Sequence, residues 1–351
     1  NVYPCATHTR FEHSIGVAYL AEKCCLKLLE HQKNLRLNPI VLKLAGLCHD
    51  LGHGPLSHGF DAFMCKNGEI YHEHEFRSVL ILKKIVEKHN ICVPNYVVEE
   101  ACELIYPQTH NLPLYMYQII SNDTDGVDVD KLDYLMRDSK FTGLQFHIDT
   151  FRFFEYMRVI DTRLCYSYDH MQFAINNIFM IRHQLHALVY QHKVVRAIEF
   201  MYYDFMNLLS NIINIGDDLD NFLQFTDHIF SHNFLELQYL KGLLSQKDYK
   251  FAQKILRRIH SRDLYKCEYE MKCKHELNLE AIVPKNTQSF IVDIVKIGYR
   301  NSPLYNVLFY DRAFDLKTLD LTSASGLFSK HTQDFIYRVY NKSSRINKTI
   351  K

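Results

Sequence analysis

Several features that would place this chain in a familiar class are missing from its sequence. No apolar run reaches the roughly 18 residues of a membrane-spanning helix, so we expect no membrane partner. The sequence has no internal repeat, no low-complexity linker and no coiled-coil pattern. It also lacks the loop G-x-x-x-x-G-K-[ST], so a nucleotide phosphate would have to be held by side chains rather than by that backbone cradle.

An excess of charge of one sign is missing too. The 41 lysines and arginines nearly cancel the 40 aspartates and glutamates, which leaves no global field to attract nucleic acid. The ten cysteines form no C-x-x-C pair, and Cys24 and Cys25 are adjacent, so we interpret them as reduced thiols of a cytoplasmic or nuclear protein. The sequence begins at Asn1 and enters a motif at once, and we expect a fragment or trimmed form of a longer protein.

The remaining patterns predict a mainly α fold with a smaller mixed part. With 47% hydrophobic residues, the chain can bury a sizeable core. Apolar spacing and capping signals predict helices over 11–31, 39–50, 73–89, 95–106, 112–121, 128–138, 150–159 and 171–213. Short β-branched and aromatic segments predict strands at 265–274, 289–295 and 305–310, followed by a last helix at 331–341. We therefore divide the chain into an all-helical core, residues 1–262, and an α+β C-terminal lobe, residues 263–351.

The stretch LAGLCHDLGHGPLSH, residues 44–58, carries more ionisable chemistry than a helix end needs. Imidazole and carboxylate ligands suit Fe, Mn, Zn or Mg better than Ca, and the lack of cysteine among them argues against a structural zinc. We predict a divalent metal held by the four residues His13, His49, Asp50 and Asp130. A lone His-Asp pair is weak evidence in a chain with 20 histidines, so the prediction depends on its surroundings.

Basic and polar residues surround these candidate ligands at helical spacing. Arg10 precedes His13 by three residues and would face the same side, where a cation favours a phosphate. Steps of four residues make two polar stripes, which are Asp130, Tyr134 and Asp138, and Arg182, His186 and Tyr190. A stripe of this kind is often only a solvated face, but leucines beside the second one favour a binding surface.

Residues after the His-Asp pair resemble acid and base machinery. His58 and Asp61 are three residues apart, so the carboxylate can fix the imidazole tautomer and raise its pKa, as a general acid requires. His53 and His74 would add hydrogen-bond donors to a phosphate chain. The metal would bind a water molecule, lower its pKa and direct it at phosphorus.

Four motifs in order complete the pattern: H-x-R-x-x-H, CHDLGHGPxSHxFD, GVDVDKxDYxxRD and R-x-x-x-H-x-x-x-YQHK. With them the chain resembles the HD-domain phosphohydrolase superfamily, and especially its SAM and HD domain-containing deoxynucleoside triphosphate triphosphohydrolases. The resemblance implies cleavage of a dNTP to a deoxynucleoside and inorganic tripolyphosphate. It implies that the four candidate ligands hold the metal, with Mg accompanying the nucleotide. The implied catalytic residues are His58, Asp61, His53 and His74.

The same resemblance implies a set of substrate contacts. Tyr134 would stack on the sugar and exclude a 2′-hydroxyl, while Asp138 and Arg182 would fix the 3′-hydroxyl and the γ-phosphate region. Tyr190 would lie near the base. The whole predicted substrate-binding set is Arg10, Lys131, Tyr134, Asp138, Arg182, His186 and Tyr190.

Regulation is where the chain departs from the family pattern. The family's mammalian members form tetramers that are activated by nucleotides bound between subunits. The resemblance therefore implies a homo-oligomer, a dimer or tetramer, with a GTP or dNTP activator. The implied regulatory residues are Arg152, Lys193 and Arg257. Neutral or acidic residues replace other expected cations, namely Tyr168, Asp169, His170 and Gln253. Each lost charge-assisted contact costs about 1.5 to 3 kcal/mol, which argues against an unchanged regulatory site.

Two other functions are compatible with the sequence. One keeps the metal and changes the substrate, giving another nucleotide phosphohydrolase or a phosphodiesterase of the superfamily. The other is a nucleic-acid-binding protein with a vestigial nucleotide site. The nucleic-acid-binding alternative depends on a basic cluster and on the basic tail, residues 342–351. The cluster consists of Lys254, Arg257, Arg258 and Arg262, although a run of basic residues is usually a solvated helix face.

Overall fold

Helices dominate the first part of the chain. A computed structural model describes residues 2–66, 73–209, 219–231, 243–277, 289–319 and 333–343. The first helices are α1 (Arg10–His31), α2 (Pro39–Cys48), α3 (His58–Lys66), α4 (His74–Lys88), α5 (Asn95–Ile105), α6 (Leu114–Ile120), α7 (Val129–Thr142) and α8 (Thr150–Glu155). The mainly α fold is confirmed, and α3 is a helix that the sequence patterns did not predict.

Local capping fixes the helices that carry the candidate ligands. Thr9 and Glu12 form a capping box at the start of α1, one turn before His13. Asn38 caps α2, whose first residue is Pro39. At the other end of α2, His49 is the C-cap residue. These caps explain why the two histidines lie at defined helix positions.

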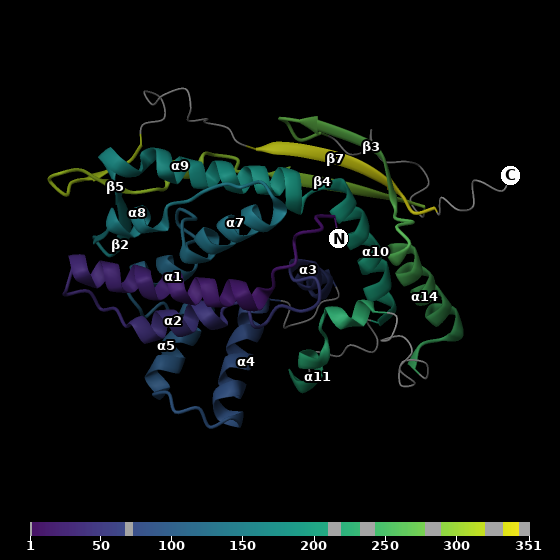
Figure 1. Ribbon diagram of the computed structural model, residues 1–351, viewed down its shortest axis with the longest axis horizontal. Helices are drawn as coiled ribbons and strands as arrows, with labels where there is room; N and C mark the ends of the chain where they lie inside the picture. Colours follow the sequence, from purple (N-terminus) through teal and green to yellow (C-terminus); the bar gives the residue numbers. More distant parts are fainter. Residues whose placement is uncertain are drawn as a thin grey trace.

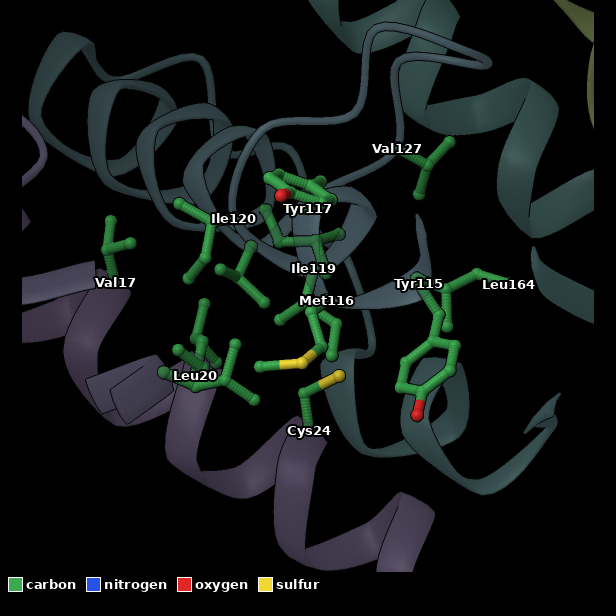
Figure 2. Packing of buried hydrophobic residues seen from close by; sticks show 14 of the residues in the cluster. Val17, Leu20, Cys24, Tyr115, Met116, Tyr117, Ile119, Ile120, Val127 and Leu164 are labelled. Atoms are coloured by element: carbon green, nitrogen blue, oxygen red, sulfur yellow. The ribbon is translucent and has the colours of Figure 1, made fainter. Parts of the chain in front are cut away.

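The core of the helical part forms where α1 crosses α2, α6 and α7. Figure 2 shows Val17, Leu20 and Cys24 of α1 facing α6, with Met116 packed close to Cys24. Six consecutive residues of α6, 115–120, are buried, as expected of a helix surrounded by protein on all sides. This packing gives the candidate ligands of α1 and α7 a rigid base.

A small sheet interrupts the helical part. Its strands are β1 (Met157–Ile160), β2 (Arg163–Ser167), β5 (Phe309–Tyr310) and β6 (Leu316–Lys317), in the order β1-β2-β5-β6. The helix predicted over 150–159 is therefore wrong beyond α8. Asp161 and Thr162 both have positive φ, and such a two-residue turn joins antiparallel strands tightly. The turn lacks the usual glycine, which is why its sequence gave no hairpin signal.

The sheet pairs segments from both sides of residue 262. Strand β2 runs parallel to β5, and Phe309 is buried in the same core as α1 and α6. The division at residue 262 remains a prediction, and any boundary there must allow for this shared sheet.

The long helix predicted at 171–213 is two helices with a different turn between them. These are α9 (Tyr168–Leu185) and α10 (Lys193–Leu209), and the turn between them is a π-helix, η1 (His186–Tyr190). Residues 210–213 lie outside the described part. Next come α11 (Leu219–Gln224), the 3-10 helix η2 (Asp227–Phe230) and α14 (Gln246–His260). Phe60 of α3, Phe205 of α10 and Leu256 of α14 share a second core.

A three-stranded antiparallel sheet closes the fold, with the order β3-β7-β4. Its strands are β3 (Lys266–Cys273), β4 (Phe290–Ile297) and β7 (Asp334–Asn341), and a 3-10 helix η4 (Pro303–Tyr305) lies between β4 and β5. Figure 1 shows this sheet at the top of the view, with α4 and α5 at the bottom. The strands predicted near 265–274 and 289–295 are confirmed.

The helix predicted at 331–341 is wrong. Residues 331–332 lie outside the described part, and the segment from Asp334 to Asn341 is the central strand β7. Six successive residues of this strand are buried, because both edges and both faces are covered. A strand buried in this way shows no alternation, so its apolar run cannot be distinguished from a helix by periodicity. In the described ranges, no helix has the length and apolar character to cross a bilayer.

Candidate functional site

The four predicted metal ligands converge from three separate helices. His13 of α1 places its Nε2 atom 3.0 Å from Oδ1 of Asp130 on α7 and 3.6 Å from Oδ2 of Asp50. His49, at the end of α2, has its Nε2 atom 3.3 Å from Asp50 Oδ1 and 3.7 Å from Asp130 Oδ1. Donor atoms of His13, His49 and Asp130 lie within 4.8 Å of one another. We call these four side chains the metal quartet.

Contacts behind the quartet hold each imidazole in one orientation. Asp133 Oδ2 lies 2.8 Å from His13 Nδ1, and Arg137 holds that carboxylate from the next turn of α7. His49 Nδ1 lies 2.9 Å from the Gly46 carbonyl oxygen, to which it donates. Both histidines therefore present Nε2 to the centre, as second contacts of this kind do for metal-bound histidines. Asp133 and Arg137 stand in the motif GVDVDKxDYxxRD, but sequence reasoning assigned them no role, although their spacing of four on α7 was a usable signal.

The charges of the quartet suit a cation. Burial alone would lower the pKa of His13, but hydrogen bonds to Asp130 and Asp133 raise it to about 9. Burial alone would also lower the pKa of His49. The neighbouring carboxylates of Asp50 and Asp130 outweigh that effect and raise its pKa. The His49 Nε2 atom is buried without a hydrogen-bond partner. An unpaired buried nitrogen among carboxylates fits a divalent ion that accepts nitrogen and oxygen ligands.

Arg10 lies at the rim of the quartet. Its guanidinium donates to Asp50 and, over 2.9 Å, to the Ser57 hydroxyl oxygen. Leu56 and Ser57 both have positive φ, which is unusual for residues other than glycine and is commonest at functional loops. The loop after the His-Asp pair is thus held in a strained form against Arg10.

A second group gathers around Asp61 at the start of α3. We call His53, His58, Asp61 and His74 the histidine cluster; their donor atoms lie within 4.8 Å of one another. Asp61 Oδ2 lies 2.9 Å from His74 Nδ1 and 3.8 Å from His58 Nδ1, so the predicted His58 partner is shared with His74. The rings of His53 and His74 stack with centroids 3.8 Å apart.

Different surroundings give these groups different pKa values. Asp61 raises the pKa of His58, whose side chain is 80% exposed. Burial lowers the pKa of His53 to about 4. Burial acts to raise the pKa of Asp61, but neighbouring His58, His74 and Arg77 hold it well below its usual range. The cluster thus combines a neutral buried imidazole with an exposed one that gains a proton readily.

Arg77 is the main residue that sequence reasoning missed. It is 1% exposed, donates to Asp61 and, over 2.8 Å, to the Gly52 carbonyl oxygen. Its guanidinium lies 5.5 Å from the ring centroid of Phe60. The helical spacing of three between His74 and Arg77 was the only signal that could have indicated it.

The two polar stripes meet at Asp138. Tyr190 donates its hydroxyl proton to Asp138 Oδ2 over 2.5 Å, and His8 Nε2 lies 2.7 Å from Oδ1. Tyr134 packs edge-on to Tyr190, with ring centroids 6.5 Å apart. The partnership with His8 was not predicted from the sequence.

The remaining predicted substrate-binding residues in this region are His186, Arg182 and Lys131. His186 packs edge-on to Tyr190 within the π-helix, a form that is common at functional sites. Burial lowers the pKa of His186 to about 4. Arg182 has a buried Nε atom without a hydrogen-bond partner. Lys131 instead turns its ammonium to Asp128, 2.5 Å away.

The predicted regulatory residues lie on three different helices. Arg152 is on α8, Lys193 on α10 and Arg257 on α14, and all three are exposed. Among the described residues, no ion pair or hydrogen bond joins these three side chains, and Figure 1 places α8 and α14 toward opposite ends of the molecule. A single chain therefore does not assemble them into one site.

The basic cluster on α14 is smaller than the sequence indicated. Arg258 is 8% exposed, and its Nε atom lies 3.0 Å from Asp263 Oδ2. Its guanidinium also lies 5.3 Å from the ring of Tyr265. Arg258 is therefore part of the core, and residues 344–351 of the basic tail lie outside the described part.

Comparisons with known proteins match the region of the chain that contains both groups of side chains. The family model of the HD domain matches residues 10–138, which contain the metal quartet and the histidine cluster. The HD domain-containing protein L394 of Acanthamoeba polyphaga mimivirus is 30% identical over 388 residues, covering 98% of this chain and 84% of that protein.

Two further relatives bear a more specific name. The deoxynucleoside triphosphate triphosphohydrolase SAMHD1 homolog of Dictyostelium discoideum is 32% identical over 305 residues, 85% of this chain and 57% of its own length. The deoxynucleoside triphosphate triphosphohydrolase SAMHD1 of Homo sapiens is 29% identical over 409 residues, 97% of this chain and 64% of its own length. The chain thus spans less than two thirds of the length of these two relatives.

Proposed function

Because this chain belongs to the HD-domain family, we propose that it is a metal-dependent hydrolase that cleaves a dNTP to a deoxynucleoside and inorganic tripolyphosphate. The observation that carries the proposal is the convergence of His13, His49 and Asp130 beside Asp50. The relatives that are named deoxynucleoside triphosphate triphosphohydrolases support the choice of substrate.

The metal quartet would hold a divalent ion of the Fe, Mn, Zn or Mg group, and its imidazole and carboxylate donors fit these metals. Such an ion lowers the pKa of a coordinated water molecule and polarises a phosphoryl oxygen. Asp133 keeps Nδ1 of His13 occupied, and the Gly46 carbonyl does so for His49. Both side chains would therefore offer the same ring nitrogen without rotating.

Residues beside the quartet would bind the phosphates and move a proton. The Arg10 side chain is 41% exposed and already donates to Asp50 and Ser57, so its guanidinium can also donate to a phosphate oxygen. His58 would donate a proton to the 5′ oxygen that leaves, because Asp61 favours its charged form and its ring is exposed. His53 and His74 would add hydrogen-bond donors beside it.

The sugar would lie along α7. Asp138 is held from two sides by His8 and Tyr190, which leaves its carboxylate oriented for a 3′-hydroxyl. Tyr134 lies one turn closer to Asp130 and would pack against the sugar face, where a 2′-hydroxyl would clash. Arg182, with its unpartnered Nε atom, would contact the triphosphate.

The regulatory part of the proposal concerns more than one chain. We infer a homo-oligomer, a dimer or tetramer, in which exposed Arg152, Lys193 and Arg257 contribute to a site for a GTP or dNTP activator. Their separation within one chain is compatible with a site completed by a neighbouring subunit. Size-exclusion chromatography with and without GTP tests this part independently of catalysis.

Product analysis tests the reaction. The purified chain is incubated with each dNTP and Mg²⁺ or Mn²⁺, with and without GTP, and the products are separated by ion exchange. Tripolyphosphate and a deoxynucleoside are expected in one step. A nucleoside monophosphate, pyrophosphate or orthophosphate would instead indicate another phosphohydrolase or a phosphodiesterase.

The variant Asp130→Asn tests the metal assignment. It removes one anionic ligand at nearly constant volume, so we expect turnover to fall by more than about a hundredfold while the far-ultraviolet circular dichroism stays unchanged. Asp220→Asn, in which the changed residue lies on α11, is the matched control. Turnover at the parent's rate in Asp130→Asn would show that the quartet is not the metal site.

A further inference from the structure

The histidine cluster has the geometry of a metal site in its own right. Asp61 Oδ2 has three imidazole nitrogens around it, Nδ1 of His74 at 2.9 Å and Nδ1 of His53 and His58 at 3.8 Å each. In a tetrahedral site with bonds of about 2.0 Å to nitrogen and oxygen, neighbouring donor atoms lie about 3.3 Å apart. We propose that His53, His58, His74 and Asp61 form a second transition-metal site, for Zn²⁺, separate from the metal quartet.

Three of the four polar atoms that would not bind the ion already have partners outside the cluster. His53 Nε2 lies 3.3 Å from Asp50 Oδ1, and His74 Nε2 lies 3.3 Å from Glu75 Oε1. The second oxygen of Asp61 accepts a hydrogen bond from Arg77. Carboxylate and arginine contacts of this kind orient the ligands of protein metal sites.

One buried nitrogen in the cluster has no hydrogen-bond partner. The His53 side chain is only 2% exposed, and its Nδ1 atom makes no hydrogen bond with any described residue. A buried polar atom without a partner costs free energy unless a ligand satisfies it. A bound ion next to Asp61 would satisfy this nitrogen.

The donor set selects the kind of ion. Three imidazoles and one carboxylate, with no thiolate, suit Zn²⁺, whereas Mg²⁺ and Ca²⁺ prefer shells of oxygen. His58 is largely exposed at the start of α3, so its ring can move aside to admit the ion and then complete the site.

Zinc at this site would inhibit the reaction. This consequence rests on the proposed function, in which His58 donates a proton and Asp61 supports it. A zinc ion would occupy the Nδ1 atom of His58 and the Asp61 oxygen that favours its protonated form. Asp50 links the two sites, because its Oδ1 atom lies 3.3 Å from both His49 Nε2 and His53 Nε2.

Zinc titration in a variant that lacks the first site tests the proposal. All zinc-binding measurements use the double variant His13→Ala/Asp130→Asn as the background. Zn²⁺ binding is measured by competition with a chromophoric chelator and by metal analysis after gel filtration. We expect one Zn²⁺ per chain. Adding His74→Ala or His58→Ala should raise the Kd for Zn²⁺ more than tenfold. His89→Ala, at the exposed end of α4, is the control and should leave the Kd unchanged.

Each outcome decides the matter. No zinc in the background variant, or equal affinity after His58→Ala and His74→Ala with circular dichroism unchanged, overturns the proposal. If zinc binds as expected but no dNTP is cleaved, the proposed function fails and the zinc site stands. If dNTPs are cleaved and zinc inhibits the otherwise unaltered chain but not one carrying His74→Ala with residual turnover, both are supported.

Discussion

At the scale of single residues, Arg77 shows how a buried charge can organise a site. Its guanidinium is buried between the Asp61 carboxylate, the Gly52 carbonyl and the rings of Phe60 and Phe222. Burying a charge is costly unless it is paired and hydrogen-bonded, so Arg77 and Asp61 stabilise one another. Because Asp61 also contacts His58 and His74, Arg77 acts on the histidine cluster as a positioning residue.

Substitution of Arg77 should affect stability and turnover together. Arg77→Met leaves Asp61 without its cation, and we expect a loss of about 3 kcal/mol in the free energy of unfolding, the lower end for buried pairs because Asp61 keeps some solvent contact. Arg77→Lys keeps the charge and should recover part of the lost free energy of unfolding. Unfolding in urea measures this free energy for each variant.

The kinetic readout separates positioning from simple stability. Under conditions in which Arg77→Met is still folded, it should lower kcat more than it raises KM. It should also shift the acidic limb of the pH profile of kcat. Lys83→Met, an exposed change on the same helix, is the control. Equal unfolding midpoints for Arg77→Met and Lys83→Met would contradict the role given to Arg77.

At the scale of elements, α4 and the loop after α2 form one unit through a single glycine. The Ser78 hydroxyl of α4 donates to the His49 carbonyl oxygen over 2.6 Å and accepts from the Gly52 amide over 2.8 Å. A Cβ atom on Gly52 would lie 2.1 Å from the His74 carbonyl oxygen. The close approach places the two histidine-bearing segments side by side.

Gly52→Ala should push these elements apart. The added methyl group meets backbone atoms that cannot rotate away, so we expect a loss of about 1 to 3 kcal/mol in the free energy of unfolding. The measurement is chemical denaturation, with zinc affinity as a second readout of the displaced His74. Gly59→Ala is the matched control, since its Cβ would lie no nearer than 3.4 Å to any neighbour. Equal stability of the two variants would refute the close-packing argument.

At the scale of the whole molecule, the metal quartet joins helices that are far apart in sequence. Its four side chains come from α1, the end of α2 and the start of α7, the same helices that build the main core. An ion bound only by the folded chain stabilises it by mass action, about 2.7 kcal/mol at a concentration of 100 Kd.

Metal removal should therefore lower thermal stability. We expect the Tm to fall by several degrees on treatment with a chelator and to return with Mn²⁺. Differential scanning fluorimetry measures the shift. Asp130→Asn should lose the recovery of Tm with Mn²⁺, whereas His89→Ala should keep it. A Tm insensitive to Mn²⁺ in the parent chain would contradict metal binding by the quartet.

Local signals were sufficient where structure depends on nearby residues. The Thr9 capping box, the Asn38-Pro39 start and the spacing of four in α7 led to correct helices, and the candidate metal ligands chosen from them lie close together in space. These local signals failed where contacts between distant segments determine the secondary structure. Strand β7 is buried between β3 and β4, so it shows no alternation, and the glycine-free turn at Asp161 concealed β1 and β2.

The sequence by itself determined which residues are available for metal binding and proton transfer, because the type and spacing of His49, Asp50 and their neighbours are covalent facts. Only the tertiary structure decided which partners those residues meet. Asp61 lies nearer to His74 than to His58, and Arg77 donates a hydrogen bond to it. Asp50 contacts both His49 of the metal quartet and His53 of the histidine cluster. Such partnerships depend on helices crossing at fixed angles and distances, which no local spacing along the chain encodes.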